Sequence, residues 1–181
     1  YSKPKTGAIL TLTIDEVIQH IAELELRKTV QKYRAKSGSI VVMDPYTGEI
    51  LALANVPYFN LNNFYDSDMQ NRRNRIVADA LEPGSTFKIV TAAAAIELGS
   101  VKEDDKIYCE NGEYDIFDRT IHDHEPRGLI TFKDVMKYSN NIGIVKVGMK
   151  LGSDVIYKYA KKFGFGELTH IDLPGEVKGI V

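Results

Sequence analysis

Apolar residues recur at helical spacing near the start of the chain. The first such run comprises Ile14, Val17, Ile18, Ile21 and Leu24. This spacing is typical of one face of an amphipathic helix, and the residues from Thr13 to Glu16 resemble a capping box at its start. The pattern therefore predicts a helix over about residues 14–35 that ends near Ser37-Gly38.

Two short apolar segments follow, Ser39–Asp44 and Glu49–Asn55. The residues between them, Asp44-Pro45-Tyr46-Thr47-Gly48, have the composition of a hairpin turn. Both segments are continuously apolar rather than alternating, which indicates a sheet covered on both faces. We therefore expect a hairpin inside a helix-sheet-helix sandwich.

The second half of the chain predicts mainly helices. Pro83-Gly84 precedes the apolar segment Ile89–Leu98, and Gly99 follows it as a stop signal. Because this segment is apolar nearly all round, we expect a buried helix. A capping box at Thr131–Asp134 predicts the start of a further helix. A second helical pattern covers Ile144–Leu151, and a last helix is predicted over Asp154–Lys162. The polar segments 57–79 and 104–128 are predicted as loops, the second with short strands.

Composition excludes several classes of protein. The chain has 181 residues, 44% of them hydrophobic and 27% charged, which is ordinary for a globular domain. Its net charge of −2 gives no reason to expect a nucleic acid partner. The cluster Arg72, Arg73 and Arg75 is offset by nearby aspartates and is interpreted as a solvated or loop-tethering patch. No segment has the length of a membrane span, and no signal-peptide pattern opens the chain.

The single cysteine, Cys109, excludes an internal disulfide. Acidic neighbours raise a thiol pKa, so we do not expect Cys109 to be a nucleophile. His122 and His124 stand among carboxylates, but no helical spacing organises them as metal ligands. No metal and no cofactor are predicted, and His20 is assigned no role.

Ser85 and Lys88 stand three residues apart at the start of the strongly apolar helix. Such residues are neighbours on a helix surface, and burial lowers a lysine pKa by disfavouring the charged amine. A neutral Lys88 can take the proton of Ser85 as its hydroxyl attacks a carbonyl, beside the free N–H groups of the helix start. The alternative is a capping serine with a lysine reaching solvent. A second Ser-x-x-Lys match, Ser2–Lys5, has no apolar helix behind it and is attributed to chance.

A second candidate set is Ser139 and Asn141, within Tyr138-Ser139-Asn140-Asn141-Ile142-Gly143. These residues are predicted to lie in a short turn between two helices. A hydroxyl there can relay a proton to a leaving group, and a side-chain amide can hold a peptide-like substrate. A plain turn is the alternative, because Ser and Asn favour turns.

Several segments in one order resemble the transpeptidase domain of class B penicillin-binding proteins. They are Val41–Ala52, Arg73-Asn74-Arg75, Glu82–Lys88, Tyr138–Gly143, Phe163–Gly166 and Asp172–Glu176. The resemblance implies that Ser85 is the acylated nucleophile and Lys88 its base. It also implies that Ser139 shuttles a proton and that Asn141 binds the substrate.

Two departures accompany the resemblance. His170 stands where the family commonly has glycine. The family's third motif, Lys-[Thr/Ser]-Gly, does not occur where it is expected, and the literal match Lys5-Thr6-Gly7 lies at the wrong end and is attributed to chance. We therefore expect residues 1–181 to be a partial transpeptidase domain without its C-terminal strands. Such a chain would be poorly active alone and would associate through an unpaired edge near Glu49–Asn55.

The resulting expectation is an α+β chain, the N-terminal part of the penicillin-binding transpeptidase or serine beta-lactamase-like fold. It would be helix-rich with a partial antiparallel sheet. The resemblance implies peptidoglycan D,D-transpeptidation on stem peptides, acylation by beta-lactams, and a parent in a membrane-bound cell-wall synthesis complex at the extracytoplasmic face, the chain itself being soluble. Two alternatives remain open: a serine beta-lactamase or beta-lactam sensor, and a non-catalytic scaffold fragment. For a shared site, Ser139 must lie within roughly two hydrogen-bond lengths of Ser85 or Lys88.

Overall fold

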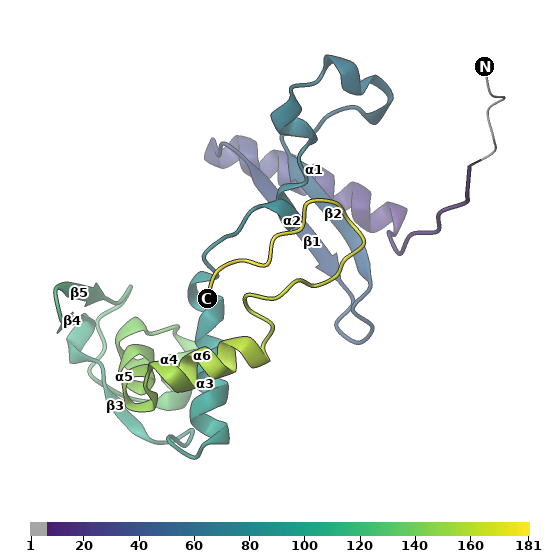
Figure 1. The fold of residues 1–181 in the computed structure, drawn as a ribbon. Coiled ribbons are helices and arrows are strands. Elements are labelled where there is room, and N and C mark those ends of the chain that lie inside the picture. Colours follow the sequence, from purple (N-terminus) through teal and green to yellow (C-terminus); the bar gives the residue numbers. More distant parts are fainter. Residues whose placement is uncertain (1–6) are drawn as a thin grey trace. The chain divides into compact units, whose positions relative to one another are not determined.

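The computed structural model describes residues 7–181 (Figure 1). The chain divides into two compact units. Unit 1 comprises the described residues up to Asp79 together with Leu173–Val177, and unit 2 comprises Ala80–Asp172 with Lys178–Val181. The match Ser2–Lys5 and the first two residues of Lys5-Thr6-Gly7 lie outside the described residues.

Unit 1 is built on one helix and one hairpin. Helix α1 (Glu16–Tyr33) is followed by strands β1 (Gly38–Met43) and β2 (Ile50–Val56), which pair antiparallel. The predicted hairpin is confirmed. The capping prediction was wrong in detail: Asp15 caps α1 by accepting from the Ile18 N–H at 2.9 Å, whereas the Thr13 hydroxyl donates to the carbonyl of Ile50 at 2.6 Å.

Helix α1 covers one face of this hairpin. Its residues Ala22 and Leu26 are buried against Ala52 and Ala54 of β2. The prediction of a sheet covered on both faces was wrong for the described residues, because Val41 and Met43 on the other face are 46% and 56% exposed. Successive strand residues point to opposite faces, so a continuous apolar run does not by itself bury both. Helix α2 (Arg75–Ala78) is linked to the second face through its N-cap residue Asn74, whose Oδ1 accepts from the Asn55 amide at 3.0 Å.

The polar segment after β2 is more ordered than a loop. It contains two 3-10 helices, η1 (Leu61–Asp66) and η2 (Met69–Arg72), and a single-turn helix α2 (Arg75–Ala78). Asp79 forms ion pairs with Arg73 and Arg75, at 2.7 and 3.3 Å. Arg72 donates to the backbone carbonyl of Ser67 at 2.7 Å. The loop-tethering interpretation of the arginine cluster is confirmed.

Unit 2 is dominated by helices. They are η3 (Gly84–Phe87), α3 (Lys88–Glu97), α4 (Phe132–Lys137), α5 (Asn141–Leu151) and α6 (Ser153–Lys162). Helix α3 packs against both α5 and α6, and a core joins Ala95 on α3 to Phe132 and Val135 on α4 and Ile142 on α5. The capping box at Thr131 is confirmed, because its hydroxyl accepts from the Asp134 N–H at 3.1 Å.

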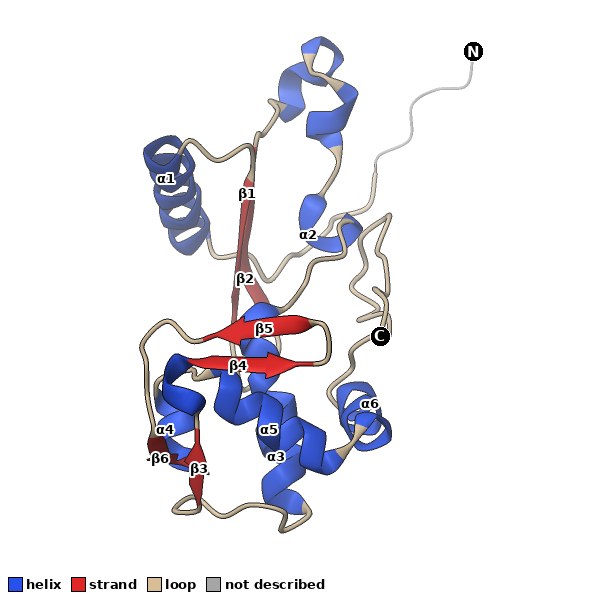
Figure 2. Ribbon diagram, turned by 90° about the vertical axis from the view of Figure 1, so that its left-hand side faces the viewer, coloured by secondary structure: helices blue, strands red, loops and turns tan. Residues whose placement is uncertain are grey.

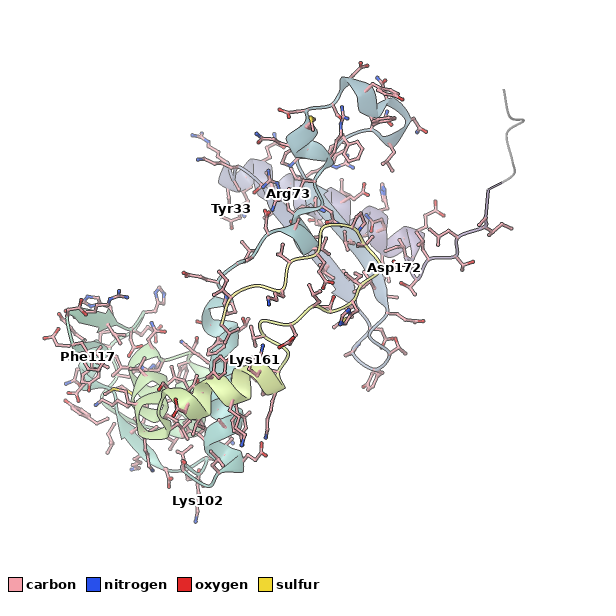
Figure 3. All side chains as sticks on the ribbon, viewed as in Figure 1. Tyr33, Arg73, Lys102, Phe117, Lys161 and Asp172 are labelled. Carbon is pink, nitrogen blue, oxygen red and sulfur yellow. The ribbon has the colours of Figure 1, made fainter. Side chains whose placement is uncertain are left out.

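Short strands fill the segment between α3 and α4. They are β3 (Lys106–Tyr108), β4 (Glu113–Ile116), β5 (Arg119–His122) and β6 (Leu129–Thr131), with the 3-10 turn η4 (Glu110–Gly112). β3 pairs with β6, and β4 pairs with β5 as a hairpin (Figure 2). Phe117 points outward at the tip of that hairpin and is 95% exposed (Figure 3).

Helix α3 is only partly interior. Val90, Thr91 and Ala94 are buried, but Ile89 and Ile96 are more than half exposed, so the prediction of a helix buried all round was wrong. The α+β class with small antiparallel sheets is confirmed. Within the described residues, no helix is long and apolar enough to cross a bilayer.

Candidate active site

Ser85 and Lys88 lie on the same turn at the start of α3. This turn is the 3-10 helix η3, which begins at Gly84 with a φ of 58°, a value at which glycine carries no steric penalty. In a 3-10 helix residues i and i+3 lie on the same side, and the Lys88 N–H donates to the Ser85 carbonyl, so both side chains start from the same side of this turn. The Ser85 side chain is exposed, and its hydroxyl forms no hydrogen bond with any described residue.

The amine of Lys88 joins α3 to the turn before α5. Its Nζ atom donates to the Ser139 carbonyl at 2.5 Å, to Ser139 Oγ at 3.0 Å and to Asn141 Oδ1 at 2.7 Å. The predicted juxtaposition of Lys88 and Ser139 is confirmed. The alternative of a lysine that reaches freely into solvent is excluded by these three contacts.

The surroundings of Lys88 shift its pKa toward the neutral amine. Burial lowers the Lys88 pKa below its ordinary value of 10.5, and the negative charge of Asp123 opposes this shift in part. Burial disfavours the charged form because the low-dielectric interior solvates an ammonium poorly. A lowered pKa increases the fraction of Lys88 that can accept a proton near neutral pH.

The turn that carries Ser139 is fixed by its neighbours. Ser139 adopts a left-handed φ of 53°, and Asn140, only 3% exposed, caps α5 by accepting from the Gly143 N–H at 2.6 Å. Asn141 is the first residue of α5 rather than a turn residue, which corrects the prediction. Its side chain therefore projects from the helix start with a fixed orientation.

Gly143 allows α4 and α5 to approach closely. A Cβ atom at this position would lie 2.5 Å from Val135 on α4, a distance that real side chains do not tolerate. The tight α4–α5 turn therefore depends on glycine at position 143.

Sequence reasoning missed two residues that hold this turn. The Asp123 carboxylate, directly after β5, accepts hydrogen bonds from the Asn140 amide at 2.6 Å and from the backbone N–H of Asn141. The Asn141 amide also donates to the His122 carbonyl at 2.8 Å. The chain pattern showed Asp123 only as one acid in a His-rich loop. No sequence signal links it to a turn that lies beyond β6 and α4.

Two other features singled out in the sequence are the cysteine and the His-rich loop. Cys109 is fully buried, and its thiol pKa is raised by burial first and then by Asp123. Among residues 7–181 no group of three or more His, Cys, Asp or Glu side chains is arranged to hold a metal ion, and His122 and His124 are included in that statement.

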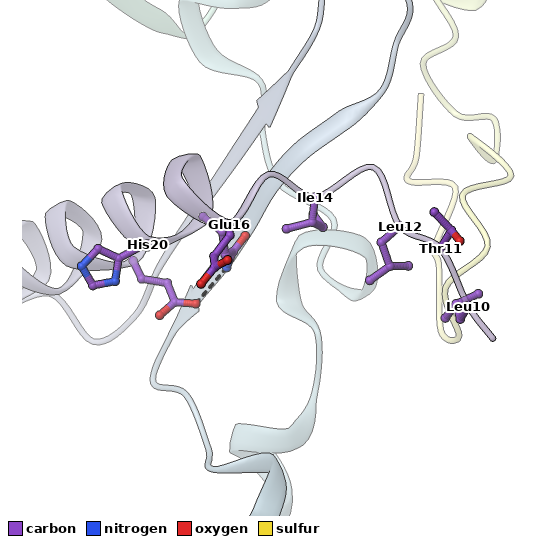
Figure 4. Close-up of a pocket in the computed structure, with 8 residues that line it drawn as sticks. Leu10, Thr11, Leu12, Ile14, Glu16 and His20 are labelled. Carbon is purple, nitrogen blue, oxygen red and sulfur yellow. Dashed lines mark hydrogen bonds between the residues drawn. The ribbon is translucent and has the colours of Figure 1, made fainter. Parts of the chain in front are cut away.

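A hollow of about 750 Å³ lies elsewhere, on unit 1, between residues 10–14 and α1 (Figure 4). Gln19 and Glu23 form a hydrogen bond of 2.9 Å in its wall. It contains none of the candidate residues. A smaller cavity of about 120 Å³ borders Ser139 in unit 2 and lies next to the candidate site.

This constellation of an exposed serine, a lysine of lowered pKa and a facing Ser-x-Asn turn coincides with a family match. The family model of the penicillin-binding protein transpeptidase domain matches residues 38–181. The chain belongs to this family.

Curated relatives and solved structures agree with the match. The chain is 34% identical over 178 residues to a probable peptidoglycan D,D-transpeptidase, PenA, of Neisseria meningitidis, covering 98% of the chain and 30% of that protein. It is 37% identical to stage V sporulation protein D of Bacillus subtilis, covering 100% of the chain and 28% of that protein. A structure described as a peptidoglycan glycosyltransferase from Burkholderia ambifaria superimposes with a TM-score of 0.82 at 32% identity, over 94% of the chain and 50% of that structure. The chain thus spans under a third of the length of these two curated relatives.

His170 has an uncommon backbone conformation for a residue other than glycine. Its φ is 59°, which lies in the left-handed region where glycine is favoured and other residues are uncommon. His170 thus adopts a backbone conformation in which a glycine would carry no steric penalty.

Proposed function

We propose that the chain carries the acyl-transfer site of a serine-type peptidoglycan D,D-transpeptidase. The observation that supports this most directly is the Lys88 amine, held between Ser139 Oγ and Asn141 Oδ1 one turn after Ser85. The printed names of the relatives PenA of Neisseria and FtsI of Escherichia coli, both peptidoglycan D,D-transpeptidases, agree with this activity.

In the first half of the reaction, Ser85 Oγ attacks the carbonyl carbon of a D-alanyl-D-alanine peptide bond. Lys88 accepts the hydroxyl proton, and the developing oxyanion is stabilised by backbone N–H groups that a helix start leaves free. The C–N bond then breaks. Ser139 passes its proton to the leaving amine of the terminal D-alanine and takes a proton in turn from the Lys88 ammonium, and an acyl ester on Ser85 remains.

In the second half, the amine of a neighbouring stem peptide attacks the ester carbonyl and loses a proton to the site. The Ser85 oxygen leaves and is reprotonated, and a new peptide cross-link is released. Asn141 orients the substrate by hydrogen bonds from its side-chain amide. A beta-lactam follows the first half only, because its leaving nitrogen stays tethered to the acyl group.

The proposed ligands follow from this chemistry, and the proposed complex and location rest on membership of the family. Stem peptides and beta-lactams are the ligands, no cofactor takes part, and the parent protein acts in a membrane-bound cell-wall synthesis complex at the extracytoplasmic face of the bacterial membrane. Labelling intact cells with a penicillin that does not cross the membrane tests the location, since a cytoplasmic site would remain unlabelled.

Penicillin labelling of the full-length protein, followed by mass spectrometry of the labelled peptide, tests the activity. We expect a covalent adduct on Ser85 with a long lifetime. Rapid loss of the adduct would instead indicate a serine beta-lactamase. The absence of an adduct on Ser85 would refute acyl transfer at this site.

A further inference from the structure

Asp123 connects the end of strand β5 to the start of helix α5. Its Oδ2 atom accepts from the Asn140 amide at 2.6 Å, and its Oδ1 atom accepts from the N–H of Asn141 and, more weakly, from that of Ile142 at 3.4 Å. A carboxylate is favoured at a helix N-terminus, where backbone N–H groups are free. One side chain therefore holds three consecutive residues, Asn140, Asn141 and Ile142, of which the first two belong to the Ser-x-Asn segment.

The negative charge of the same carboxylate also raises the pKa of Lys88. This charge partly offsets the lowering of the Lys88 pKa by burial. Two other charged groups near the turn form ion pairs: Lys146 on α5 pairs with Glu110 at 2.5 Å, and Arg127 pairs with Glu125 at 2.5 Å. His124 borders the small cavity beside Ser139.

We propose that Asp123 is a positioning residue of the acyl-transfer site. By its hydrogen bond to Asn140, Asp123 holds the Ser139–Asn141 segment in contact with Lys88. This inference rests on the proposed function, because positioning has meaning only for a reaction at Ser85. The buried Asn140 connects Asp123 to the turn: its side-chain Nδ2 donates to Asp123, and its side-chain Oδ1 caps α5 by accepting from the Gly143 N–H. A change at Asp123 thus acts on the residue that separates Ser139 from Asn141.

The test uses the full-length protein with three variants. Asp123→Asn keeps the size of the side chain but replaces one of its two acceptor oxygens by an NH2 donor, so either the Asn140 amide or the N–H groups at the start of α5 lose their acceptor. In Asp123→Asn with Asn140→Asp, donor and acceptor are exchanged, and the hydrogen bond is restored while a carboxylate stays at the helix start. Asp118→Asn is the matched control, because Asp118 is an exposed acid on the same β4–β5 hairpin.

The measurement is the rate of penicillin acylation as a function of pH, with the thermal unfolding midpoint of each variant. For Asp123→Asn we expect a loss of about 10²-fold in the maximal rate, the effect typical of a small misplacement of reacting groups. The acid limb of its profile should also move to lower pH, because removing a negative charge lowers the Lys88 pKa. The double variant should recover at least part of the rate and move the limb back, and Asp118→Asn should match the wild type.

Each outcome decides the inference. A wild-type protein without an adduct on Ser85 overturns the proposed function and the inference with it. If the wild type is labelled but Asp123→Asn reacts at the same rate and pH, Asp123 has no positioning role. A variant that loses rate equally at all pH values, in step with its unfolding midpoint and without rescue in the double variant, shows a merely structural carboxylate. If Asp123→Asn does not fold, an active double variant supports the pairing and an inactive folded one rejects it.

Discussion

The Nζ atom of Lys88 lies 2.7 Å from Oδ1 of Asn141, although the two residues are 53 positions apart in the chain. Packing of α3 against α5 makes this contact possible. The candidate site is therefore a product of the helix core of unit 2, and substitutions in that core should be felt at the site.

Replacing Ser85 by alanine should abolish covalent penicillin labelling of the full-length protein. The variant removes the nucleophilic oxygen and leaves the turn intact, because the Ser85 hydroxyl makes no hydrogen bond with a described residue. Gel fluorescence with a labelled penicillin measures the effect. Ser153→Ala on α6 is the control and should label normally; labelling of Ser85→Ala would place the nucleophile elsewhere.

Replacing Lys88 by alanine should slow acylation by about 10²- to 10⁴-fold, the usual contribution of a general base. Lys88→Arg should not restore the rate, because a guanidinium stays protonated and cannot accept a proton. Stopped-flow acylation kinetics provide the measurement, with the exposed Lys133→Arg as the control. Recovery in Lys88→Arg would show that charge alone is needed.

Replacing Asn141 by aspartate should move the acid limb of the pH profile of acylation to higher pH. The active form of Lys88 is neutral, so the rate rises as pH passes upward through the Lys88 pKa. A carboxylate next to Nζ favours the ammonium and raises that pKa. Asn141→Ala separates the effects, since it loses the contact without adding charge. An unmoved limb in Asn141→Asp would mean that the limb does not report Lys88.

Replacing Gly143 by alanine should destabilise the protein, with a cost of about 1–3 kcal/mol for overpacking. The new Cβ would lie 2.5 Å from Val135, whereas at Gly148, on the same helix, the nearest atom would be 3.8 Å away on Thr91. Gly148→Ala should therefore be neutral or stabilising by up to about 1 kcal/mol, as helix propensity predicts. Urea unfolding compares the two, and equal losses would contradict the close α4–α5 approach.

Cys109 should resist thiol reagents in the native protein. It is fully buried, and its raised pKa reduces the reactive thiolate. Thiol titration of the 181-residue chain, which has no other cysteine, should be slow without denaturant and fast with it. Rapid native labelling would show that the core around Cys109 opens readily.

Local signals predicted much of this structure. The position of Ser85 and Lys88 on one turn at a helix start, the capping box at Thr131 and the hairpin turn at Pro45 are each contained in a few consecutive residues, and each is confirmed. The resemblance to the family placed Ser139 and Asn141 in the same site. Those features depend on spacing and on capping chemistry, which a sequence displays directly.

Features that depend on distant contacts were not predictable. Asp123 forms its hydrogen bonds only when the end of β5 lies next to the start of α5, and the residues around it in the sequence do not predict this contact. Thr13 does not cap α1, because its hydroxyl donates to the Ile50 carbonyl, and Asp15 accepts from the Ile18 N–H in its place. The exposed side of α3 likewise reflects which neighbours are present, not the polarity of its residues.

Which atom donates in the hydrogen bond between the Lys88 amine and the Ser139 hydroxyl depends on whether Lys88 is protonated. An ammonium has a hydrogen for each of its acceptors, namely the Ser139 carbonyl, Ser139 Oγ and Asn141 Oδ1. A neutral amine has one hydrogen fewer and a lone pair. The carbonyl and amide oxygens can only accept, whereas the hydroxyl can also donate, so it turns its own hydrogen toward the nitrogen. The same two atoms, 3.0 Å apart, then exchange the roles of donor and acceptor, and the proton can pass between them without movement of the backbone.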